Sequence, residues 1–306
     1  MKMLALAGPT GIGKTELAAE LARRLPAEVV AVDSMQVYRG MDIGTGKPPP
    51  GLREEIPHHG LDLAEPGEEF DVLRYVEAVG PVIREIEGRG KWVLLVGGCG
   101  LYLRVLLRGL CGAPGRDLAL RERLREEGER EGWEKLHARL REVDPRAAEK
   151  IHPNDARRII RALEVQLSTG RPISEWQEQT RPVDPTWASC PVIALNCDRE
   201  WLYRRIQERV DAWFARGWLE EARGLSARSL SRTAREALGY RELFEYLQGL
   251  RGWEATRALI QGNTRRYAKR QWSWFRHEPC VKWVRVQPGA APTEAAAEIL
   301  STLNPV

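Results

Sequence analysis

The stretch that most constrains the fold lies near the start of the chain and reads GPTGIGKT, from Gly8 to Thr15. The spacing G-x-x-x-x-G-K-T is that of a phosphate-binding loop, in which backbone N–H groups surround one phosphate, the lysine reaches a second, and the threonine faces Mg²⁺. An apolar run precedes it at 4–7 and strong helix formers follow at 16–22, so we predict the order strand, loop, helix. The sequence therefore predicts a diphosphate site with Mg²⁺ as cofactor and Thr15 as its ligand, built from Gly8, Thr10, Gly11, Ile12, Gly13, Lys14 and Thr15.

Two further apolar runs predict neighbouring strands. Residues 29–32 read VVAV and end at Asp33, and residues 92–96 read WVLLV and run into Gly-Gly-Cys-Gly. A carboxylate directly after a strand lies at the sheet edge where open α/β proteins bind ligands. An ordinary P-loop nucleotidase often carries its Walker-B acid after the strand at 92–96, and this chain has none there. Alternating strands and helices predict an α/β fold, a P-loop NTPase-like parallel sheet flanked by helices.

The segment 112–186 differs in character from the rest of the chain. Strand patterns are absent from it and charged helical patterns replace them, so we predict an all-helical insertion domain. The core domain is then discontinuous, formed by 1–111 and 187–306. Sheet character returns at 191–196, and the end of the chain after Gln287 is polar and poorly patterned. Between them lies an amphipathic stretch whose apolar residues fall at helical spacing: Leu202, Ile206, Val210 and Trp213.

Composition bounds the class of protein. A chain of 306 residues with 43% hydrophobic content can bury one large core and a second, smaller one. Its five cysteines form no C-x-x-C pair and have no histidine at zinc spacing, which favours neither a disulfide framework nor a zinc site. No apolar run approaches the roughly 20 residues of a membrane span. We expect a cytoplasmic protein without a membrane partner, and a monomer.

Charge is concentrated in one segment near the end of the chain. Net charge is only +4, which argues against general coating of nucleic acid. The segment 264–277, however, reads TRRYAKRQWSWFRH and mixes five basic residues with four aromatic ones. Such a mixture is typical of RNA binding, because phosphates take the cations and bases stack on rings. Arg266 and Arg270 are our candidates for RNA contact; the alternative is a solvated helix face opposite a buried tryptophan face.

Motif chemistry alone leaves two enzymatic hypotheses and one without catalysis. In a kinase of small molecules or nucleotides, ATP would occupy the loop and Asp33 would act on Mg²⁺ or on the acceptor hydroxyl. In a transferase with a diphosphate leaving group, the loop would hold an activated alkyl donor and Asp33 would take a proton from the nucleophile. The basic aromatic segment favours the transferase. An RNA-binding module with a vestigial loop is disfavoured because Lys14, Thr15 and Asp33 are all present.

Eight stretches spread along most of the chain carry a resemblance to one family. The chain resembles the tRNA dimethylallyltransferases, which prenylate N6 of the adenosine at tRNA position 37, immediately 3′ of the anticodon. This resemblance implies that the loop holds dimethylallyl diphosphate and that the acceptor is an anticodon stem-loop with an A-rich 3′ flank. The matching stretches are GPTGIGKT, DSMQVYRGMDIGTGKP, IPHHGLDL, VGGCGLYL, IHPNDARRIIRALEV, NCDREWLYRRIQERV, AREALGYRE and TRRYAKRQWSWFR.

The resemblance also implies roles for four catalytic residues. Lys14 stabilises the charge that builds on the departing pyrophosphate, and Asp33 is the general base toward the N6 amine. Arg235 matches a family arginine that contacts the diphosphate, the alternative being an ordinary surface helix residue. Cys99 stands where the family commonly has a threonine. Because a thiol is a weak hydrogen-bond donor, the contact made by that hydroxyl is weaker here or is taken over by water.

The target adenosine lies in a stacked anticodon loop, so its base must flip out to reach a buried diphosphate. By resemblance, the segment after the second strand surrounds the flipped adenine, and the sequence RRIIR in the helical insertion contacts the anticodon loop. For RRIIR the alternative is a set of solvated or ion-paired helix residues. The implied tRNA-binding residues are Asp33, Ser34, Met35, Gln36, Arg157, Arg158, Ile159, Ile160 and Arg161.

Overall fold

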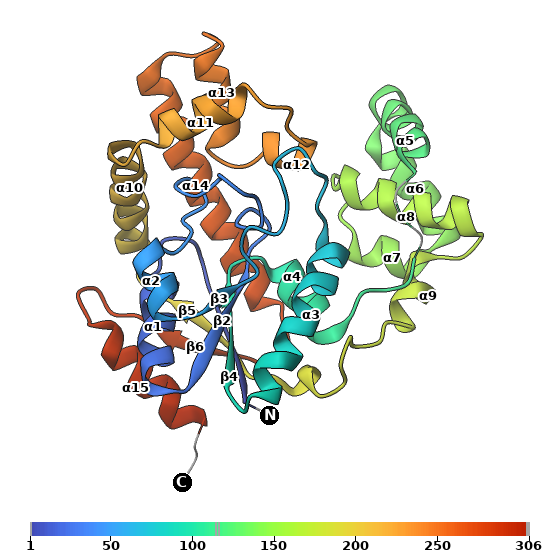
Figure 1. Ribbon diagram of the computed structural model, residues 1–306. Coiled ribbons are helices and arrows are strands. Elements are labelled where there is room, and N and C mark those ends of the chain that lie inside the picture. Colours follow the sequence, from blue (N-terminus) through green and yellow to red (C-terminus); the bar gives the residue numbers. More distant parts are fainter. Residues whose placement is uncertain (1, 114, 116, 304–306) are drawn as a thin grey trace. The chain divides into compact units, whose positions relative to one another are not determined.

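The structure is a computed structural model that describes residues 2–113, 115 and 117–303 (Figure 1). The chain divides into two compact units. The first, here called the core unit, comprises Met1–Leu107 and Thr186–Val306, and the second, the helical unit, comprises Arg108–Pro185. The sequence analysis placed the insertion at 112–186.

The core unit is built on a six-stranded sheet in the order β3-β2-β4-β1-β5-β6, and every neighbouring pair is parallel. Ala7 of β1 and Val32 of β2 both pair with Gly97 of β4, so the three strands end at one level. Gly8, Asp33 and Gly98 therefore meet at the carboxyl edge of the sheet. The strands are β1 (Met3–Ala7), β2 (Ala27–Val32), β3 (His58–His59), β4 (Trp92–Gly97), β5 (Val192–Asn196) and β6 (Val281–Arg285).

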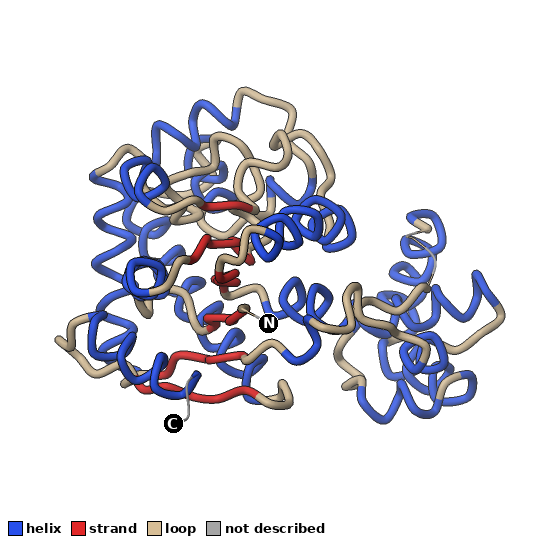
Figure 2. Tube along the Cα trace, turned by 60° about the horizontal axis from the view of Figure 1, so that its bottom comes forward, coloured by secondary structure: helices blue, strands red, loops and turns tan. Residues whose placement is uncertain are grey.

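Helices cover both faces of this sheet (Figure 2). The predicted α/β fold, a parallel sheet flanked by helices, is confirmed. The helices of the core unit are α1 (Lys14–Arg24), α2 (Pro50–Glu55), α3 (Val72–Gly88), α4 (Gly100–Arg108, which runs into the helical unit), α10 (Arg199–Ala215), α11 (Trp218–Ser226), α12 (Arg232–Arg235), α13 (Tyr240–Leu247), α14 (Trp253–Arg276) and α15 (Pro292–Leu303), with a 3₁₀ turn at Trp187–Ser189.

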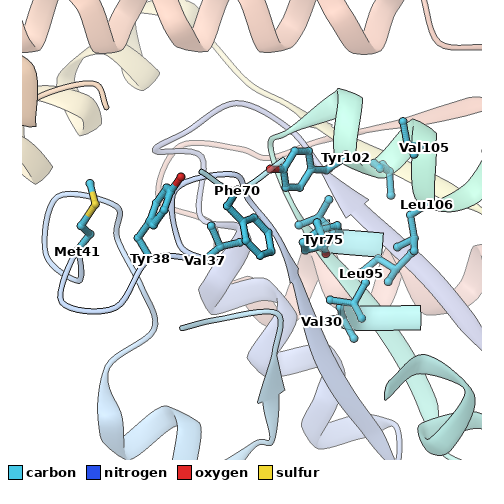
Figure 3. Packing of buried hydrophobic residues seen from close by; sticks show 14 of the residues in the cluster. Val30, Val37, Tyr38, Met41, Phe70, Tyr75, Leu95, Tyr102, Val105 and Leu106 are labelled. Carbon is cyan, nitrogen blue, oxygen red and sulfur yellow. The ribbon is translucent and has the colours of Figure 1, made fainter. Parts of the chain in front are cut away.

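Alternate residues of each strand supply two separate apolar clusters, because side chains of a strand point to opposite faces in turn. On one face, Val30 and Leu95 pack against Tyr75 of α3 and Tyr102 and Leu106 of α4 (Figure 3). The buried Tyr75 hydroxyl donates to the Ala31 carbonyl at 2.8 Å, which fixes α3 on the sheet. On the other face, the cluster joins α1, α10 and α15 to the strands. Both faces are thus sealed, and ligands have access at the strand ends.

The helical unit has a separate apolar core, drawn mainly from α5, α6 and α8. Helix α8 is capped by Asp155, whose carboxylate accepts from the Arg158 N–H at 3.2 Å, and ends at Gly170 with a left-handed φ of 71°. Among the residues described in this unit there is no strand. Its helices are α5 (Leu118–Glu131), α6 (Trp133–Val143), α7 (Pro145–Lys150), α8 (Ala156–Thr169) and α9 (Ile173–Glu178).

Two elements near the end of the chain were missed by the sequence analysis. The region after Gln287 contains α15, whose Ala296 and Ile299 are buried in the cluster with α1. Strand β6 lies at the sheet edge, where Lys282 and Trp283 are exposed, so its sequence shows little apolar patterning. In the described part of the chain no helix has the length and apolar run that crossing a bilayer requires.

Candidate active site

A cavity of about 320 Å³ lies at the carboxyl edge of the sheet in the core unit. Its walls are the loop between β1 and α1, the first turns of α1, the loops after β2 and β4, and the faces of α10 and α14 that point toward them. This is the edge where open α/β sheets bind ligands. Of the predicted diphosphate residues, those that line the cavity are Thr10, Gly11, Gly13, Lys14 and Thr15.

The β1–α1 loop has the backbone of a phosphate cradle. Gly8, Gly11 and Gly13 adopt φ values of 145°, 87° and 102°, which residues other than glycine rarely adopt. A Cβ on Gly8 would also come within 3.2 Å of Leu195. Gly8 and Ile12, although predicted for diphosphate binding, do not line the cavity, and the Ile12 side chain is buried in the core. Their part in diphosphate binding stays a prediction for backbone groups alone.

Lys14 is folded back onto this loop. Its ammonium donates to the carbonyls of Gly8 and Pro9, both at 2.9 Å. Burial lowers the pKa of Lys14 to about 7, and the nearby Arg209 guanidinium lowers it further. A diphosphate bound in the cavity would supply the anionic partner that this ammonium lacks in the free protein.

Arg209 on α10 is a cavity-lining residue that the sequence analysis did not select. Its Nη2 donates to Thr10 Oγ1 at 2.5 Å, and the guanidinium carbon lies 4.5 Å from the centre of the Trp213 ring. Its buried Nε has no hydrogen-bond partner among the described residues. Burial lowers the pKa of Arg209 to about 10. The available signal was RRIQERV, in which Arg205 and Arg209, four residues apart, share one face of a helix.

Three of the cations that line this cavity share one property, whereas Lys47, which also lines it, is paired with Asp42 and Asp62. Lys14, Arg205 and Arg209 line it, and none of them forms an ion pair within the described ranges. Buried charges are ordinarily paired, because an unpaired charge away from water is costly. Glu16 and Asp33, the two carboxylates of the cavity, stay beyond ion-pair distance of all three. The arrangement therefore fits an anionic ligand with several oxygens, such as a diphosphate.

Asp33 faces the same cavity from the end of β2. Its Oδ1 accepts from the backbone N–H groups of Met35 at 2.8 Å and Gln36 at 3.3 Å, which fixes the carboxylate. Burial raises the pKa of Asp33 above its usual value, although these two N–H groups and Lys14 oppose the shift. A fixed carboxylate with a raised pKa is suited to accept a proton near neutral pH.

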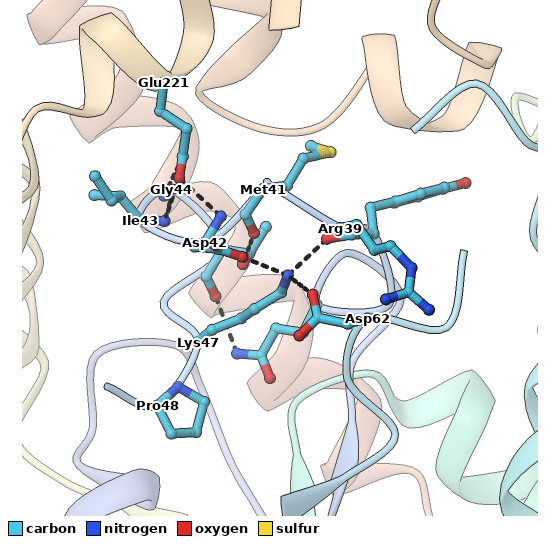
Figure 4. Close-up of polar contacts among 12 residues, drawn as sticks. Arg39, Met41, Asp42, Ile43, Gly44, Lys47, Pro48, Asp62 and Glu221 are labelled. Atoms are coloured by element: carbon cyan, nitrogen blue, oxygen red, sulfur yellow. Dashed lines mark hydrogen bonds and ion pairs between the residues drawn. The ribbon is translucent and has the colours of Figure 1, made fainter. Parts of the chain in front are cut away.

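The loop that follows Asp33 is held by a buried lysine, Lys47, and a half-buried glutamate, Glu221 (Figure 4). The Lys47 side chain is 1% exposed and donates to the Tyr38 carbonyl, Asp42 Oδ1 and Asp62 Oδ1 at 2.6, 2.6 and 2.5 Å. All three ammonium hydrogens are thus used. Carboxylate oxygens of Glu221 accept from the N–H groups of Asp42 and Ile43, each at 2.9 Å. The network makes this wall of the cavity rigid.

Gln36 joins that loop to the Asp33 carboxylate. Its Nε2 donates to the carbonyls of Thr45 and Gly46 at 3.1 and 3.2 Å, while its backbone N–H reaches Asp33. Gln36 lines the cavity, whereas Ser34 and Met35 do not. The tRNA contacts expected of Ser34 and Met35 stay predictions.

Helix α14 combines both interpretations of the basic aromatic segment. Trp272 and Phe275 are buried, as a packed tryptophan face requires, while Arg266 and Arg270 are exposed. Gln271, which the sequence analysis did not select, ties two loops together: its Oε1 accepts from the Thr10 N–H at 2.7 Å and its Nε2 donates to the Gly98 carbonyl at 3.0 Å. Its only sequence signal is a lone amide within a basic run.

Cys99 follows β4 beside Gly98 and is not among the residues that line the cavity. Burial raises the pKa of its thiol to about 11, and the nearby Asp33 carboxylate adds to the shift. At neutral pH the thiol is therefore protonated and a poor nucleophile. A catalytic part for Cys99 stays a prediction.

Arg235 lies elsewhere in the core unit. It ends the short helix α12, is exposed, and is not among the residues that line the cavity. Its assignment to the diphosphate stays a prediction, and Arg209 has the position at the loop that was expected of Arg235.

The RRIIR segment forms the first turns of α8 in the helical unit. Ile159 and Ile160, 0% and 8% exposed, pack in the core of that unit, so their part in tRNA binding stays a prediction for backbone groups alone. Adjacent helical residues are about 100° apart, so a contiguous run cannot face one partner. Arg157 and Arg158 are exposed, and Arg161 pairs with the buried carboxylate of Glu164 at 2.7 Å.

Comparison with known proteins gives one consistent result. A family model described as IPP transferase matches residues 36–278, and one described as isopentenyl transferase matches residues 1–56. The chain is 48% identical to a tRNA dimethylallyltransferase of Geobacter sulfurreducens over 285 residues, 92% of this chain and 91% of the relative. It is also 48% identical to a tRNA dimethylallyltransferase of Symbiobacterium thermophilum, covering 99% of this chain and 95% of that protein.

Two solved structures share the fold over nearly the whole chain. The full-length tRNA isopentenylpyrophosphate transferase of Bacillus halodurans is 37% identical with a TM-score of 0.72, covering 99% of this chain and 95% of that one. A eukaryotic dimethylallyltransferase solved acting on tRNA is 28% identical with a TM-score of 0.78, covering 99% of this chain and 80% of that one. The chain therefore belongs to the IPP transferase family, together with these tRNA dimethylallyltransferases.

Proposed function

We propose that the protein transfers a dimethylallyl group from dimethylallyl diphosphate to N6 of the adenosine at tRNA position 37, 3′ of the anticodon, releasing pyrophosphate. One observation carries the proposal: Lys14, Arg205 and Arg209, which have no ion-pair partners among the described residues, line the same cavity as the fixed carboxylate of Asp33 at the strand end. The names of the relatives support the substrates. The sequence of β4 supports a donor other than ATP, because no Walker-B acid follows this strand.

The diphosphate would be held by the β1–α1 loop with Lys14, Arg205 and Arg209 around it. As the C–O bond of the donor breaks, its electron pair moves to the diphosphate, whose negative charge rises. Cations and backbone N–H groups already in position stabilise that charge without reorganisation. Lys14 would leave its carbonyl partners and turn toward the diphosphate, since it binds only uncharged oxygens in the free protein.

The N6 amine attacks the allylic carbon from the side opposite the leaving group. Its lone pair is delocalised into the adenine ring, so it is a weak nucleophile unless its proton is removed as the C–N bond forms. Asp33 would accept that proton, and its raised pKa makes it a stronger base than an exposed aspartate. The adenosine must leave its stack to come this close.

Mg²⁺ would bind together with the diphosphate and not before it. Thr15 lines the cavity, and its side chain has no hydrogen-bond partner elsewhere in the described chain. Within the described residues no group of three or more His, Cys, Asp or Glu side chains could hold a metal ion. Mg²⁺ prefers few protein ligands and several phosphate oxygens, so Thr15 with a diphosphate fits it. When bound, the ion neutralises part of the diphosphate charge.

The tRNA would be held by both units. In the core unit, the exposed Arg266 and Arg270 of α14 are proposed to contact backbone phosphates. In the helical unit, Arg157 and Arg158 of α8 are proposed to contact the anticodon loop. Because tRNA is the acceptor, we infer a cytoplasmic location. We also propose that the protein acts as a monomer.

The test is an incubation of the protein with Mg²⁺ and an unmodified anticodon stem-loop, with dimethylallyl diphosphate or ATP supplied separately. Mass spectrometry should show one added dimethylallyl group with the diphosphate donor only. A stem-loop with guanosine at position 37 is the matched control and should gain nothing. Phosphate transfer from ATP, with no gain from the prenyl donor, would replace the proposal by a kinase.

A further inference from the structure

Helix α10 and the residue after it place more arginine side chains along the cavity than one bound diphosphate can contact. Arg205 and Arg209 line the cavity, and so does Arg216 directly after the helix end. At 3.6 residues per turn these three positions fall within about 40° of one another, on one helix face. With a rise of 1.5 Å per residue, the Cα of Arg216 lies about 10 Å beyond that of Arg209 and about 16 Å beyond that of Arg205.

The row runs from the phosphate-binding loop toward solvent. Arg205 approaches the loop at Gly13, since a Cβ placed on that glycine would lie 3.7 Å from its Nη1. Arg209 donates to Thr10 of the same loop. Arg216, by contrast, is exposed. Two phosphate groups joined by one oxygen are much shorter than this row, so the diphosphate seated on the loop leaves Arg216 without a contact.

Arg216 also has no use inside the protein. Its side chain forms no hydrogen bond or ion pair with any residue that the structure describes. Some exposed arginines of the core unit are paired, as Arg228 is with Glu65 at 2.9 Å and Arg232 with Glu236 at 3.0 Å, but Arg216 differs from these in that it also lines the cavity. A free guanidinium at the outer end of a cationic wall attracts anions from solution.

We propose that Arg216 captures the diphosphate of the prenyl donor at the cavity mouth, from which the donor moves along α10 to Arg209, Arg205 and Lys14. The proposal rests on the proposed function, because it takes the diphosphate donor as the ligand. Arg216 is then a residue for association, and it makes no contact once the donor is seated. A cleft lined by charges of one sign raises the association rate of a ligand of the opposite charge in this way.

The experiment measures donor binding without tRNA. Dimethylallyl diphosphate and Mg²⁺ are mixed with the protein in a stopped-flow instrument, and tryptophan fluorescence is followed, because Trp213 stacks on Arg209 in the cavity. The variants are Arg216→Gln, Arg216→Glu and Arg216→Lys. Arg223→Gln is the matched control: Arg223 is an exposed arginine of α11 that does not line the cavity.

We expect Arg216→Gln to lower the association rate constant roughly threefold to tenfold and Arg216→Glu to lower it further. Arg216→Lys and Arg223→Gln should keep the wild-type rate. Dissociation should be unchanged in all of them. The differences should vanish near 1 M salt, where charges are screened beyond about 3 Å.

Three results would overturn the inference. Equal association rates in wild type and Arg216→Gln would mean that Arg216 only stabilises the C-terminus of α10, where a positive charge is favourable. Urea unfolding would then show that the Arg216→Gln variant is less stable than wild type. Faster dissociation in Arg216→Gln would mean a direct contact with the seated diphosphate. A raised KM for the stem-loop alone would assign Arg216 to RNA. Failure of the wild-type protein to bind the donor even when the stem-loop is present would instead overturn the proposed function on which the inference rests.

Discussion

Replacing Arg209 by methionine should make the free protein more stable and the enzyme less active. Burial lowers the pKa of this guanidinium well below its ordinary value, to about 10, so folding disfavours its charged form at every pH below about 10. At 1.36 kcal/mol per pKa unit, holding the charge costs about 3 kcal/mol at pH 7. The substitution also removes the hydrogen bond to Thr10, worth about 1 kcal/mol. The free variant should therefore gain roughly 2 kcal/mol in unfolding free energy.

Binding of the diphosphate reverses the sign of this effect. A hydrogen bond between a guanidinium and a diphosphate oxygen contributes about 1.5 to 3 kcal/mol, and more charge gathers on that oxygen as the leaving group departs. Loss of Arg209 should lower kcat/KM for the donor roughly 10- to 100-fold, since each 1.36 kcal/mol corresponds to a factor of ten. Most of the loss should fall on kcat.

Urea unfolding with and without inorganic pyrophosphate and Mg²⁺ measures both halves of the argument. Wild type should gain more stability from pyrophosphate than the Arg209→Met variant does. Arg257→Met is the matched control, because Arg257 on α14 is paired with Asp211 at 2.8 Å in a solvent-exposed ion pair, and its loss should lower the stability only slightly. The reasoning would be refuted if, without ligand, the Arg209→Met variant were less stable than wild type and if pyrophosphate stabilised both proteins equally. Arg209 would then not be a destabilising cation that serves to bind the donor.

Three further predictions concern single residues of the site. Asp33→Asn should lower kcat by a factor of about 10² to 10⁴ and change donor binding only a few fold. In the wild type, kcat should fall as the pH drops below the raised pKa of Asp33, because the protonated carboxyl group cannot accept a proton. A pH profile of kcat for both proteins checks this. Lys14, with a pKa of about 7, is mostly neutral above that pH, so donor affinity should weaken as pH rises above 7, with proton uptake visible in calorimetry at pH 8. Lys47→Met leaves the Asp42 and Asp62 carboxylates and one carbonyl without their cation and should cost about 1 to 3 kcal/mol in urea unfolding, with a lower kcat.

The parts of the fold that the sequence predicted are those whose pattern is local. The loop from Gly8 to Thr15 needs its glycines because three of them adopt left-handed φ values, and such a requirement is written in consecutive residues. The strands at 29–32 and 92–96 are buried on both faces and read as continuous apolar runs. Strand β6 is exposed at an edge, and α15 buries only Ala296 and Ile299 among its described residues, so neither has an apolar pattern strong enough to predict.

Arg209 shows why the site was less predictable than the fold. In α10 the apolar spacing of Leu202, Ile206 and Val210 predicts which face packs on the sheet. It does not say that the neighbouring face meets a cavity formed by the loop of residues 8–13, which lies about 200 residues earlier. Arg235, by contrast, stands in a matching stretch of sequence but ends α12 outside the cavity. Proximity to the diphosphate depends on packing between distant segments, and resemblance of a short stretch does not supply it.

Helix α14 also places neighbouring residues on faces with different surroundings. Arg266 and Arg270 are exposed on it, while Gln271, one residue after Arg270, reaches inward to the Thr10 N–H and the Gly98 carbonyl. One rigid element thus carries a cationic surface suited to RNA and a clamp on the phosphate-binding loop. Neutralising Arg270 should weaken RNA binding in a salt-dependent way and leave donor binding unchanged. Gln271→Glu can still accept from Thr10 but cannot donate to Gly98, so it should weaken donor binding and leave RNA binding unchanged.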